Sequence, residues 1–237
     1  MRMCQQKGAA MKTVLITGVS SGIGKALAIK MLENNMKVIG ISRNSSKINH
    51  PNFINHCLDL MDLNAVENLI KKLLKEENIS ILVNNAGVGF YGLHEELNPS
   101  KIHELITVNL EAPLLITNLV LRNFKKQGGI IVNISSVTAH KSNPHGAAYG
   151  ATKAGLSSFS DSIFDEARKH GVRVITIEPD MTDTNLYRNA DFTVSTEDGC
   201  YLTADNVADA VIYAINSGCV THMELKPQFH RISRKER

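Results

Sequence analysis

Short apolar runs rich in Val and Ile alternate along the chain with longer segments in which apolar residues recur every three or four positions. The runs are apolar almost throughout, which is typical of strands covered on both faces. The expected strands are Thr13–Thr17, Lys37–Ser42, Phe53–Leu58, Ile79–Asn84, Gly129–Ile134, Val172–Ile177 and Val220–Leu225.

The segments between these runs have helical spacing. The expected helices are Ile23–Glu33, Val66–Leu74, Ile102–Phe124, Tyr149–His170 and Ala204–Ile215. This alternation predicts βαβ crossovers, and therefore an α/β fold with a seven-stranded, doubly wound parallel sheet and helices on both faces. No repeat or break in composition divides the chain, so one domain over residues 1–237 is expected. Ligands of such sheets bind beyond the carboxyl ends of the strands.

Composition excludes several classes of protein. Apolar residues make up 43% and charged residues 21%, as in ordinary soluble globular proteins, and no apolar stretch reaches the length of a membrane span. The net charge of +3 is too small to indicate nucleic-acid binding. A minor alternative is nucleic-acid binding through basic residues that gather near the end of the chain, which are Lys226, Arg231, Arg234, Lys235 and Arg237. A solvated end is the simpler interpretation of them.

The four cysteines are far apart and have no zinc-binding spacing, so no metal site is expected from them. They are Cys4, Cys57, Cys200 and Cys219. Reduced thiols of this kind favour the cytoplasm. The first 11 residues lack the apolar region of a signal peptide and are interpreted as a disordered leader.

A glycine-rich loop follows the first strand and begins the first helix. It reads Thr17-Gly18-Val19-Ser20-Ser21-Gly22-Ile23-Gly24. Gly18 suits a tight turn, Gly22 a close approach of backbone to a pyrophosphate, and Gly24 close packing of helix on strand. Free N–H groups at the start of the helix then face the anion. The spacing differs from the usual dinucleotide fingerprint, and a simple turn is the alternative.

The end of the second strand bears on the choice of cofactor. An NAD site places an acidic residue here for the ribose hydroxyl, whereas this chain has Ser42 followed by Arg43. A guanidinium suits a 2′-phosphate, so NADP(H) is expected rather than NAD(H). The alternative is that Arg43 is an ordinary surface arginine.

Two further loops follow strands and have weaker signals. Asp59, beside Leu60, could accept from an adenine amino group. Asn85 could tie loop backbones together, while Ala86 and Gly87 allow a cofactor to pass close by. Each of these residue types is also common in caps and turns.

The residues after the fifth strand carry the candidate chemistry. Tyr149 and Lys153 are four residues apart, on one face of the expected helix. The ammonium is expected to lower the pKa of the phenol, which could then exchange a proton with an alcohol or carbonyl oxygen. Ser136 could bind the same oxygen. A core tyrosine with a snorkelling lysine is the alternative for the pair alone.

Taken together, these motifs resemble the short-chain dehydrogenase/reductase family over nearly the whole chain. The resemblance rests on Thr17–Gly24, Asn84–Gly87, Asn109, Ser136, and Tyr149 with Lys153. It implies a single Rossmann-like domain that uses NAD(P) to oxidise or reduce an alcohol or carbonyl group. Tyr149 would be the general acid/base, Ser136 would hold the substrate oxygen, and Lys153 would bind the nicotinamide ribose and lower the pKa of the tyrosine.

The resemblance also gives Asn109 a role in a proton relay through a water. Pro113 has no N–H, so the carbonyl of Asn109 is expected to lose its helical partner and accept from that water. A kink without catalytic meaning is the alternative.

The segment after the sixth strand departs from the family pattern. Family members have Pro-Gly there, whereas this chain has Pro179-Asp180, followed by Thr182 and by Thr184 at the position of the family's nicotinamide-contacting threonine. Pro179, Thr182 and Thr184 are expected at the cofactor, and residues 181–203 form the expected substrate loop. His140 and His145 could face substrate, although loop histidines are usually just exposed.

The sequence therefore predicts an NADP(H)-dependent oxidoreductase, a reductase of ketones or 3-oxoacyl groups, acting on a small molecule in the cytoplasm. An NADP(H)-binding sensor or scaffold with little turnover is the alternative. A homodimer or homotetramer is expected from the resemblance. Apolar stripes at Leu114–Phe124 and Ala151–Phe159 would suit such an assembly, but a buried core explains them equally well.

Overall fold

The computed structural model of the protein describes residues 11–195, 197–229 and 231–234. A seven-stranded sheet with the order β3-β2-β1-β4-β5-β6-β8 lies at its centre, and every neighbouring pair in it is parallel. Its strands are β1 (Thr13–Thr17), β2 (Lys37–Ser42), β3 (Phe53–Cys57), β4 (Ile79–Asn84), β5 (Gly129–Ile134), β6 (Val172–Pro179) and β8 (His222–Leu225). The predicted doubly wound parallel sheet is confirmed.

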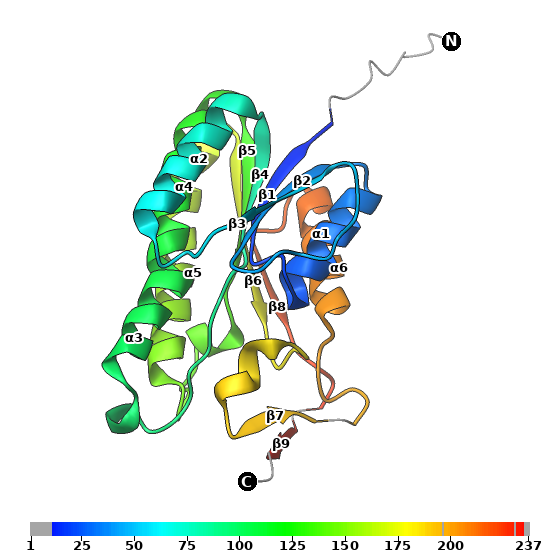
Figure 1. Ribbon diagram of the computed structural model, residues 1–237. Helices are drawn as coiled ribbons and strands as arrows, with labels where there is room; N and C mark the ends of the chain where they lie inside the picture. Colours follow the sequence, from blue (N-terminus) through cyan, green and yellow to red (C-terminus); the bar gives the residue numbers. More distant parts are fainter. Residues whose placement is uncertain (1–10, 196, 230, 235–237) are drawn as a thin grey trace.

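Helices cover both faces of this sheet (Figure 1). On one face lie α1 (Gly22–Glu33) and α6 (Ala204–Ser217), which pack against each other. On the other lie α2 (Leu63–Glu76), α4 (Ala112–Gln127) and α5 (Ala147–Ala167), with the short α3 (Pro99–Ile106) beyond them. Each crossover returns the chain so that the carboxyl ends of all seven strands meet at one edge.

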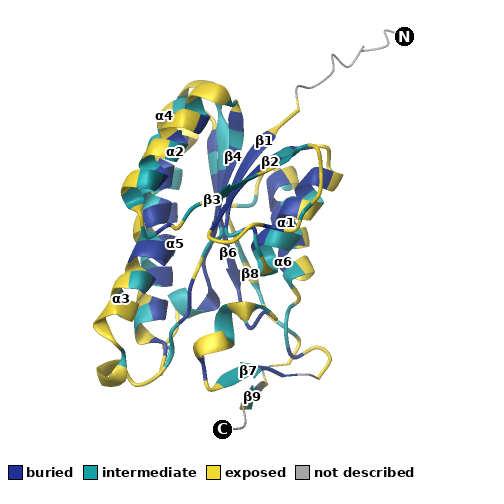
Figure 2. Cartoon of the chain, viewed as in Figure 1, coloured by how far each residue is buried: buried dark blue, intermediate teal, exposed yellow. Residues whose placement is uncertain are grey.

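Two apolar cores separate the sheet from its two helical layers, and Figure 2 shows the buried residues along the inner side of each helix. Successive residues of β1 alternate between the cores: Leu15 faces α2 and α4, whereas Val14 and Ile16 face α1 and α6. This alternation follows from the two-residue period of a strand. All three side chains are fully buried, as strands covered on both faces require.

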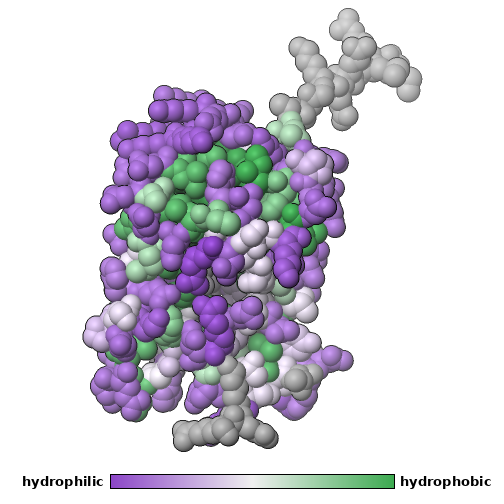
Figure 3. Space-filling view, in the orientation of Figure 1, coloured by the Kyte–Doolittle hydropathy of each residue, from purple (hydrophilic) through white to green (hydrophobic). Residues whose placement is uncertain are grey.

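The edge strands β3 and β8 differ from this pattern, and two of the four residues of β8, His222 and Glu224, are exposed. The sequence predicts a strand covered on both faces, but β3 is only partly buried, and Ile54 is 38% exposed. Figure 3 shows apolar side chains gathered over the part of this face where β2 and β3 lie. An apolar run therefore marks a strand here without marking its burial.

The expected long helix from Ile102 to Phe124 is interrupted. A π-helical turn, Thr107–Glu111, joins α3 to α4, and Ala112 N–H donates to the carbonyl of Thr107, five residues back. Pro113 lies in the first turn of α4. Because it has no N–H, the regular helical hydrogen bonds are interrupted here and the helix widens into the π-helical turn. The stretch 99–127 is long and apolar enough to cross a membrane, but half of its most apolar window is buried inside the protein, as in a core helix.

Small elements add to the carboxyl-end edge of the sheet. Two short strands, β7 (Phe192–Val194) and β9 (Ile232–Arg234), pair antiparallel and lie near the ends of β6 and β8 (Figure 1). The sequence did not predict this pair. Single helical turns are η1 (His94–Glu96), η3 (Val137–Ala139), η4 (Arg168–His170) and η5 (Asn185–Asn189). The predicted leader falls almost entirely outside the described residues, as do Cys4, Lys235 and Arg237.

Candidate active site

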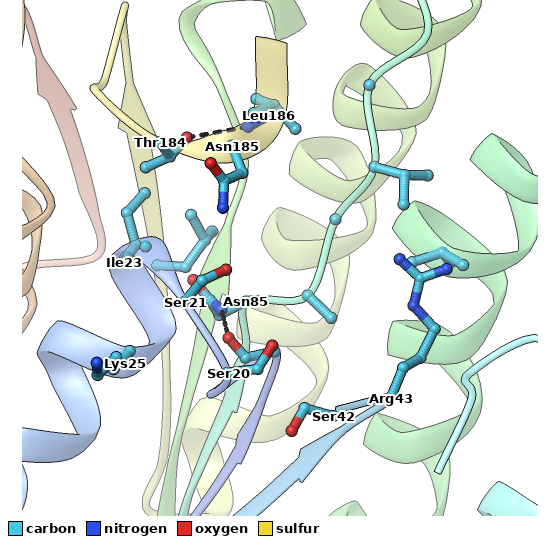
Figure 4. A pocket seen from close by; sticks show the side chains of 18 of the residues that line it. Ser20, Ser21, Ile23, Lys25, Ser42, Arg43, Asn85, Thr184, Asn185 and Leu186 are labelled. Carbon is cyan, nitrogen blue, oxygen red and sulfur yellow. Dashed lines mark hydrogen bonds between the residues drawn. The ribbon is translucent and has the colours of Figure 1, made fainter. Parts of the chain in front are cut away.

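A pocket lies at the carboxyl-end edge of the sheet, where β1, β2, β4, β5 and β6 end. Its wall is built from the loop between β1 and α1, the loops after β2 and β4, and the segment after β6. Figure 4 shows Ser20 and Ser21 on one side of the open space and Arg43 on the other. Segments far apart in sequence meet here because parallel crossovers bring every strand end to one edge.

The glycine loop has the conformation that its residues predict. Gly18 and Gly22 have φ angles of +79° and +55°, values that side chains other than glycine rarely adopt. Gly18 N–H donates to the carbonyl of Ile41 at 2.7 Å, which ties the loop to β2. A Cβ on Gly24 would lie 2.2 Å from the carbonyl oxygen of Gly18, so this position admits no side chain.

The start of α1 is open to an anion. Ser21 is the N-cap residue of α1, but its side chain makes no capping hydrogen bond to the first turn, and that turn contains no acidic residue. Its free N–H groups and the positive end of the helix dipole adjoin a cradle of backbone that Gly18 and Gly22 keep clear of side chains. These residues fit the pyrophosphate of a dinucleotide.

The loop after β4 is anchored to the same turn. Asn85 Nδ2 donates to the carbonyl of Thr17 at 2.8 Å, and Thr17 Oγ1 accepts from the N–H groups of Asn85 and Ala86 at 3.0 Å each. Asn85 therefore ties loop backbones together, as the sequence predicts. The result is a rigid wall in which Ala86 and Gly87 present little side chain to the pocket.

Cationic side chains line the pocket on more than one side, with Lys25 on α1 and Arg43 after β2 (Figure 4). Arg43 is 47% exposed, and its guanidinium lies 3.7 Å from Glu104, a weak contact at the surface. Lys25 and Lys47 also line the pocket, and the sequence analysis did not single them out. Asp59, which also lines the pocket, accepts from the N–H of Met61. The wall of the pocket therefore holds more cationic than anionic side chains, which suits a phosphate.

Tyr149 and Ser136 lie together on the other side of the pocket. Tyr149 lies in the first turn of α5 and is 5% exposed, and Ser136 follows β5 and is 6% exposed. Ser136 is close enough to the Tyr149 hydroxyl to lower the pKa of the tyrosine. Ser136 Oγ also accepts from the N–H of Thr138 at 3.2 Å and from its hydroxyl at 3.0 Å, which fixes the serine rotamer. The pair can hold and protonate one substrate oxygen.

The pKa of Tyr149 contradicts the sequence-based expectation. Burial raises it to about 12, and Ser136 only partly offsets this. Lys153 does not lower it, because its Nζ donates to the carbonyl of Ile134 at 2.8 Å and lies 5.8 Å from the centre of the tyrosine ring. Burial lowers the pKa of Lys153 itself to about 8. In the protein without cofactor, the desolvation of Tyr149 and Lys153 therefore outweighs the attraction between the phenolate and the ammonium.

Asn109 lies behind the pocket rather than in its wall. Its side chain donates to the carbonyl of Val88 at 2.9 Å and accepts from the N–H of Val88 at 2.8 Å. A Cβ on Gly87 would lie 3.5 Å from Asn109 Oδ1 and 3.7 Å from Lys153 Nζ, so the three residues are neighbours. The π-helical turn places Asn109 here, and its role in a water relay stays a prediction.

The segment after β6 closes the pocket. Pro179, Asp180, Thr182 and Thr184 all line it. Thr184 contacts the glycine loop, since a Cβ on Gly22 would lie 3.1 Å from its methyl group. Asp180, at the position of the departure from Pro-Gly, accepts from the N–H of Met181 and lies 3.8 Å from the ammonium of Lys141.

Aromatic rings stand beside Tyr149, and no local sequence signal predicts them. The centres of the Tyr91 and Tyr149 rings are 5.8 Å apart, and Tyr91 also contacts Phe192 at 5.1 Å and Tyr187 at 6.0 Å. Burial raises the pKa values of Tyr91 and Tyr187, so both remain phenols. Loops that the fold brings together over long range form this cluster.

The pocket brings together nearly all the residues predicted to bind cofactor or substrate. Those in its wall are Gly18, Ser20, Ser21, Gly22, Ile23, Ser42, Arg43, Asp59, Leu60, Asn85, Ala86, Gly87, Ser136, Tyr149, Lys153, Pro179, Thr182 and Thr184. Gly24 and Asn109 support the wall from behind. His140 and His145 are not among the lining residues, and His140 instead contacts Glu178.

Known proteins share this sequence pattern and fold. Residues 12–193 match the family described as short chain dehydrogenase. A benzil reductase of Bacillus cereus, which forms (S)-benzoin, is 31% identical over 232 residues, covering 85% of this chain and 92% of the relative.

Two solved structures are also similar. An alcohol dehydrogenase of the archaeon Thermococcus sibiricus, complexed with 5-hydroxy-NADP, has a TM-score of 0.81 and 25% identity, covering 93% of this chain and 98% of that one. A 4-hydroxyisoleucine dehydrogenase mutant, complexed with NADH and succinate, has a TM-score of 0.82 and 26% identity, with coverage of 92% and 98%. The family match, the relative's coverage and the geometry of the site agree, and the chain belongs to the short-chain dehydrogenase family of oxidoreductases.

Proposed function

We propose that the protein is an NADP(H)-dependent carbonyl reductase in which Tyr149 protonates the substrate oxygen. One observation carries the proposal: Tyr149 and Ser136 share a pocket with a glycine loop open to an anion. A bound nicotinamide cofactor would supply the hydride. The glycine loop would hold its pyrophosphate, and Lys153 its ribose hydroxyls.

The residues of the chain account for the remaining chemistry. Ser136 Oγ would donate to the carbonyl oxygen and hold it beside Tyr149. A tyrosine with a pKa of about 12 keeps its proton at neutral pH and is therefore ready to give it to the oxygen as negative charge develops there. This state suits reduction of a carbonyl group better than oxidation of an alcohol, which would need the phenolate.

The preference for NADP(H) rests on charge. Arg43, Lys25 and Lys47 all line the pocket, and β2 ends without the acidic residue that would repel a 2′-phosphate. The weak contact between Arg43 and Glu104 leaves the guanidinium free to turn toward a stronger anion. Relatives of known structure bind either form of the cofactor, with 5-hydroxy-NADP in one and NADH in another.

The aromatic cluster favours an apolar carbonyl compound. The Tyr91 ring lies beside the Tyr149 ring, and Tyr187, which lines the pocket, and Phe192 both contact Tyr91. Flat apolar groups gain contact energy against such rings. The benzil reductase relative acts on an aromatic diketone, which agrees with this surface. We therefore place aromatic and small apolar ketones ahead of 3-oxoacyl thioesters.

The test measures cofactor oxidation with a panel of carbonyl compounds: an aromatic diketone, a small aliphatic ketone and a 3-oxoacyl thioester. We expect turnover of the diketone with NADPH in preference to NADH. Arg43→Ala should weaken NADPH binding roughly tenfold to a hundredfold, since a hydrogen bond to a charged group contributes about 1.5–3 kcal/mol. Arg122→Ala, an exposed arginine on α4, is the matched control. Tight binding of NADPH without turnover of any substrate would instead favour a sensor.

We also propose a cytoplasmic homo-oligomer. Cys57, Cys200 and Cys219 are free thiols, as expected in a reducing compartment. Part of the stripe on α4 belongs to the core, since Ile116, Val120 and Phe124 are fully buried. Sedimentation of the purified protein would measure the assembly, and a monomer at micromolar concentration would contradict it.

A further inference from the structure

A cluster of two histidines and one glutamate lies near the edge of the sheet, outside the pocket described above. His140 follows η3, Glu178 is in β6 near its end, and His222 begins β8. His140 Nε2 is 2.8 Å from Glu178 Oε1, and His222 Nε2 is 3.1 Å from Glu178 Oε2. Three separate segments therefore point imidazole and carboxylate groups at one another.

The carboxylate of Glu178 requires a positive charge. Its side chain is 1% exposed, and buried carboxylates are found paired with cations or bound to metals. Among the described residues, the ion-pair partners of Glu178 are these two histidines, and neither Lys nor Arg lies within reach of it. Lys141, the residue next to His140, contacts Asp180 instead.

The geometry suits a transition-metal ion. The ligand atoms of the three residues all lie within 4.8 Å of one another. Bonds of about 2.0–2.1 Å to a tetrahedral zinc ion would separate its ligands by roughly 3.4 Å, so small side-chain movements suffice. Both imidazoles already present Nε2, and proton transfer to Nδ1 would free the lone pair of that nitrogen. The histidine side chains are 58% and 45% exposed, which leaves room for a water as the fourth ligand.

A second layer of hydrogen bonds orients the glutamate. Ser157 Oγ donates to Glu178 Oε1 at 2.7 Å and lies 2.7 Å from Ser135 Oγ, which donates in turn to the carbonyl of Lys153. Such partners hold ligands in place at metal sites. They also connect the cluster to the strand end that carries Ser136 and to the helix that carries Tyr149.

We propose that His140, Glu178 and His222 form a binding site for one divalent transition-metal ion of the Zn²⁺ class per chain. The ion would clamp the segment after β5 to the ends of β6 and β8, and so stabilise the strand ends beside the active site. This site is independent of the proposed reaction, and its test does not require turnover.

The test uses the full-length protein, free of any affinity tag and treated with chelator, which is then titrated with Co²⁺ and, separately, with Zn²⁺. We expect one Co²⁺ per chain with the visible absorption of a four-coordinate ion, and a Zn²⁺-dependent rise in melting temperature. His140→Ala and His222→Ala should each weaken metal binding by tenfold or more and abolish most of the rise in melting temperature. Because both histidines are exposed, these variants should fold, whereas Glu178→Gln alters a buried group.

His103→Ala, an exposed histidine on α3, is the matched control and should bind like the wild type. Three results would overturn the proposal: the absence of saturable binding, binding that neither histidine variant weakens, or a stoichiometry other than one ion per chain. In the first two cases the cluster is a hydrogen-bonded group that stabilises Glu178 without a metal.

Discussion

The two sides of the pocket are built by different kinds of interaction. The loop between β1 and α1 is held by backbone geometry, with glycines at positive φ and hydrogen bonds from Asn85. The segment after β6 is held by side chains from distant loops, chiefly the rings around Tyr91. Backbone constraints of the first kind appear in the sequence as a local glycine pattern, whereas contacts between distant side chains leave no local pattern. The sequence therefore predicts the cofactor side of the pocket but not the aromatic contacts of the substrate side.

The largest effect is expected from adding one carbon to the glycine loop, which tests whether close backbone packing holds the cofactor side of the pocket. In Gly24→Ala the new Cβ would meet the Gly18 carbonyl at 2.2 Å and Asn85 Nδ2 at 2.3 Å. We expect the free energy of unfolding to fall by about 1–3 kcal/mol, as for other overpacked sites, together with loss of NADPH binding. Chemical denaturation and cofactor titration measure the two effects.

Gly150→Ala is the control for that variant. Gly150 lies in α5, and a Cβ there would have ordinary contacts at 3.5 Å. Alanine should stabilise this helix by about 0.5–1 kcal/mol, because it has less backbone freedom to lose. Equal behaviour of the two alanine variants would show that close packing at Gly24 is not what holds the loop.

Lys153, between the two sides, gives a prediction for pH. Burial lowers its pKa to about 8, so the ammonium is present below that pH and is lost above it. The pKa of Tyr149, about 12, leaves the phenol protonated throughout this range. Because the ammonium of Lys153 is proposed to hold the ribose hydroxyls of the cofactor, the rate of carbonyl reduction should be flat near neutrality and fall by up to tenfold per pH unit above about pH 8. A rate that stays constant to pH 10 would show that the charge of Lys153 is not required.

The substrate side should respond more weakly and more selectively. Phe192→Ala removes a ring that supports Tyr91 and Tyr187, at centre distances of 5.1 Å and 5.5 Å. Contacts of this kind contribute about 0.5–1.5 kcal/mol, so kcat/KM for an aromatic ketone should fall by roughly twofold to tenfold, with NADPH affinity unchanged. Phe229→Ala, an exposed phenylalanine, should have no effect. An equal loss for aromatic and aliphatic ketones would argue against a ring-lined substrate site.

The contrast between local patterns and long-range contacts also explains which parts of the fold the sequence predicts. The apolar runs place all seven strands, and for the five between the edge strands β3 and β8 the reason is two-sided burial, which leaves a nearly continuous apolar run. The pair β7 and β9 went unpredicted, because each strand has three residues and depends on a partner far along the chain. Pro113 indicated a disturbed helix but did not show that it would widen into a π-helical turn.

Long-range burial also accounts for the errors at the site. The expected low pKa of Tyr149 considered only a neighbour four residues away, and the desolvation that reverses its direction depends on the whole fold. The meeting of His140 with Glu178 and His222 is of the same kind, since each residue alone is an ordinary polar side chain. Motifs indicate which groups are present, and packing decides the state in which they act.

The central claim is that the Tyr149 hydroxyl gives its proton to the substrate oxygen. The most direct measurement compares single-turnover oxidation of bound NADPH by the best carbonyl substrate in the wild type, in Tyr149→Phe and in Tyr213→Phe, an exposed tyrosine on α6. We predict that Tyr149→Phe slows the reaction about a hundredfold or more while binding NADPH normally, and that Tyr213→Phe matches the wild type. A Tyr149→Phe rate within a few-fold of the wild type would contradict the claim.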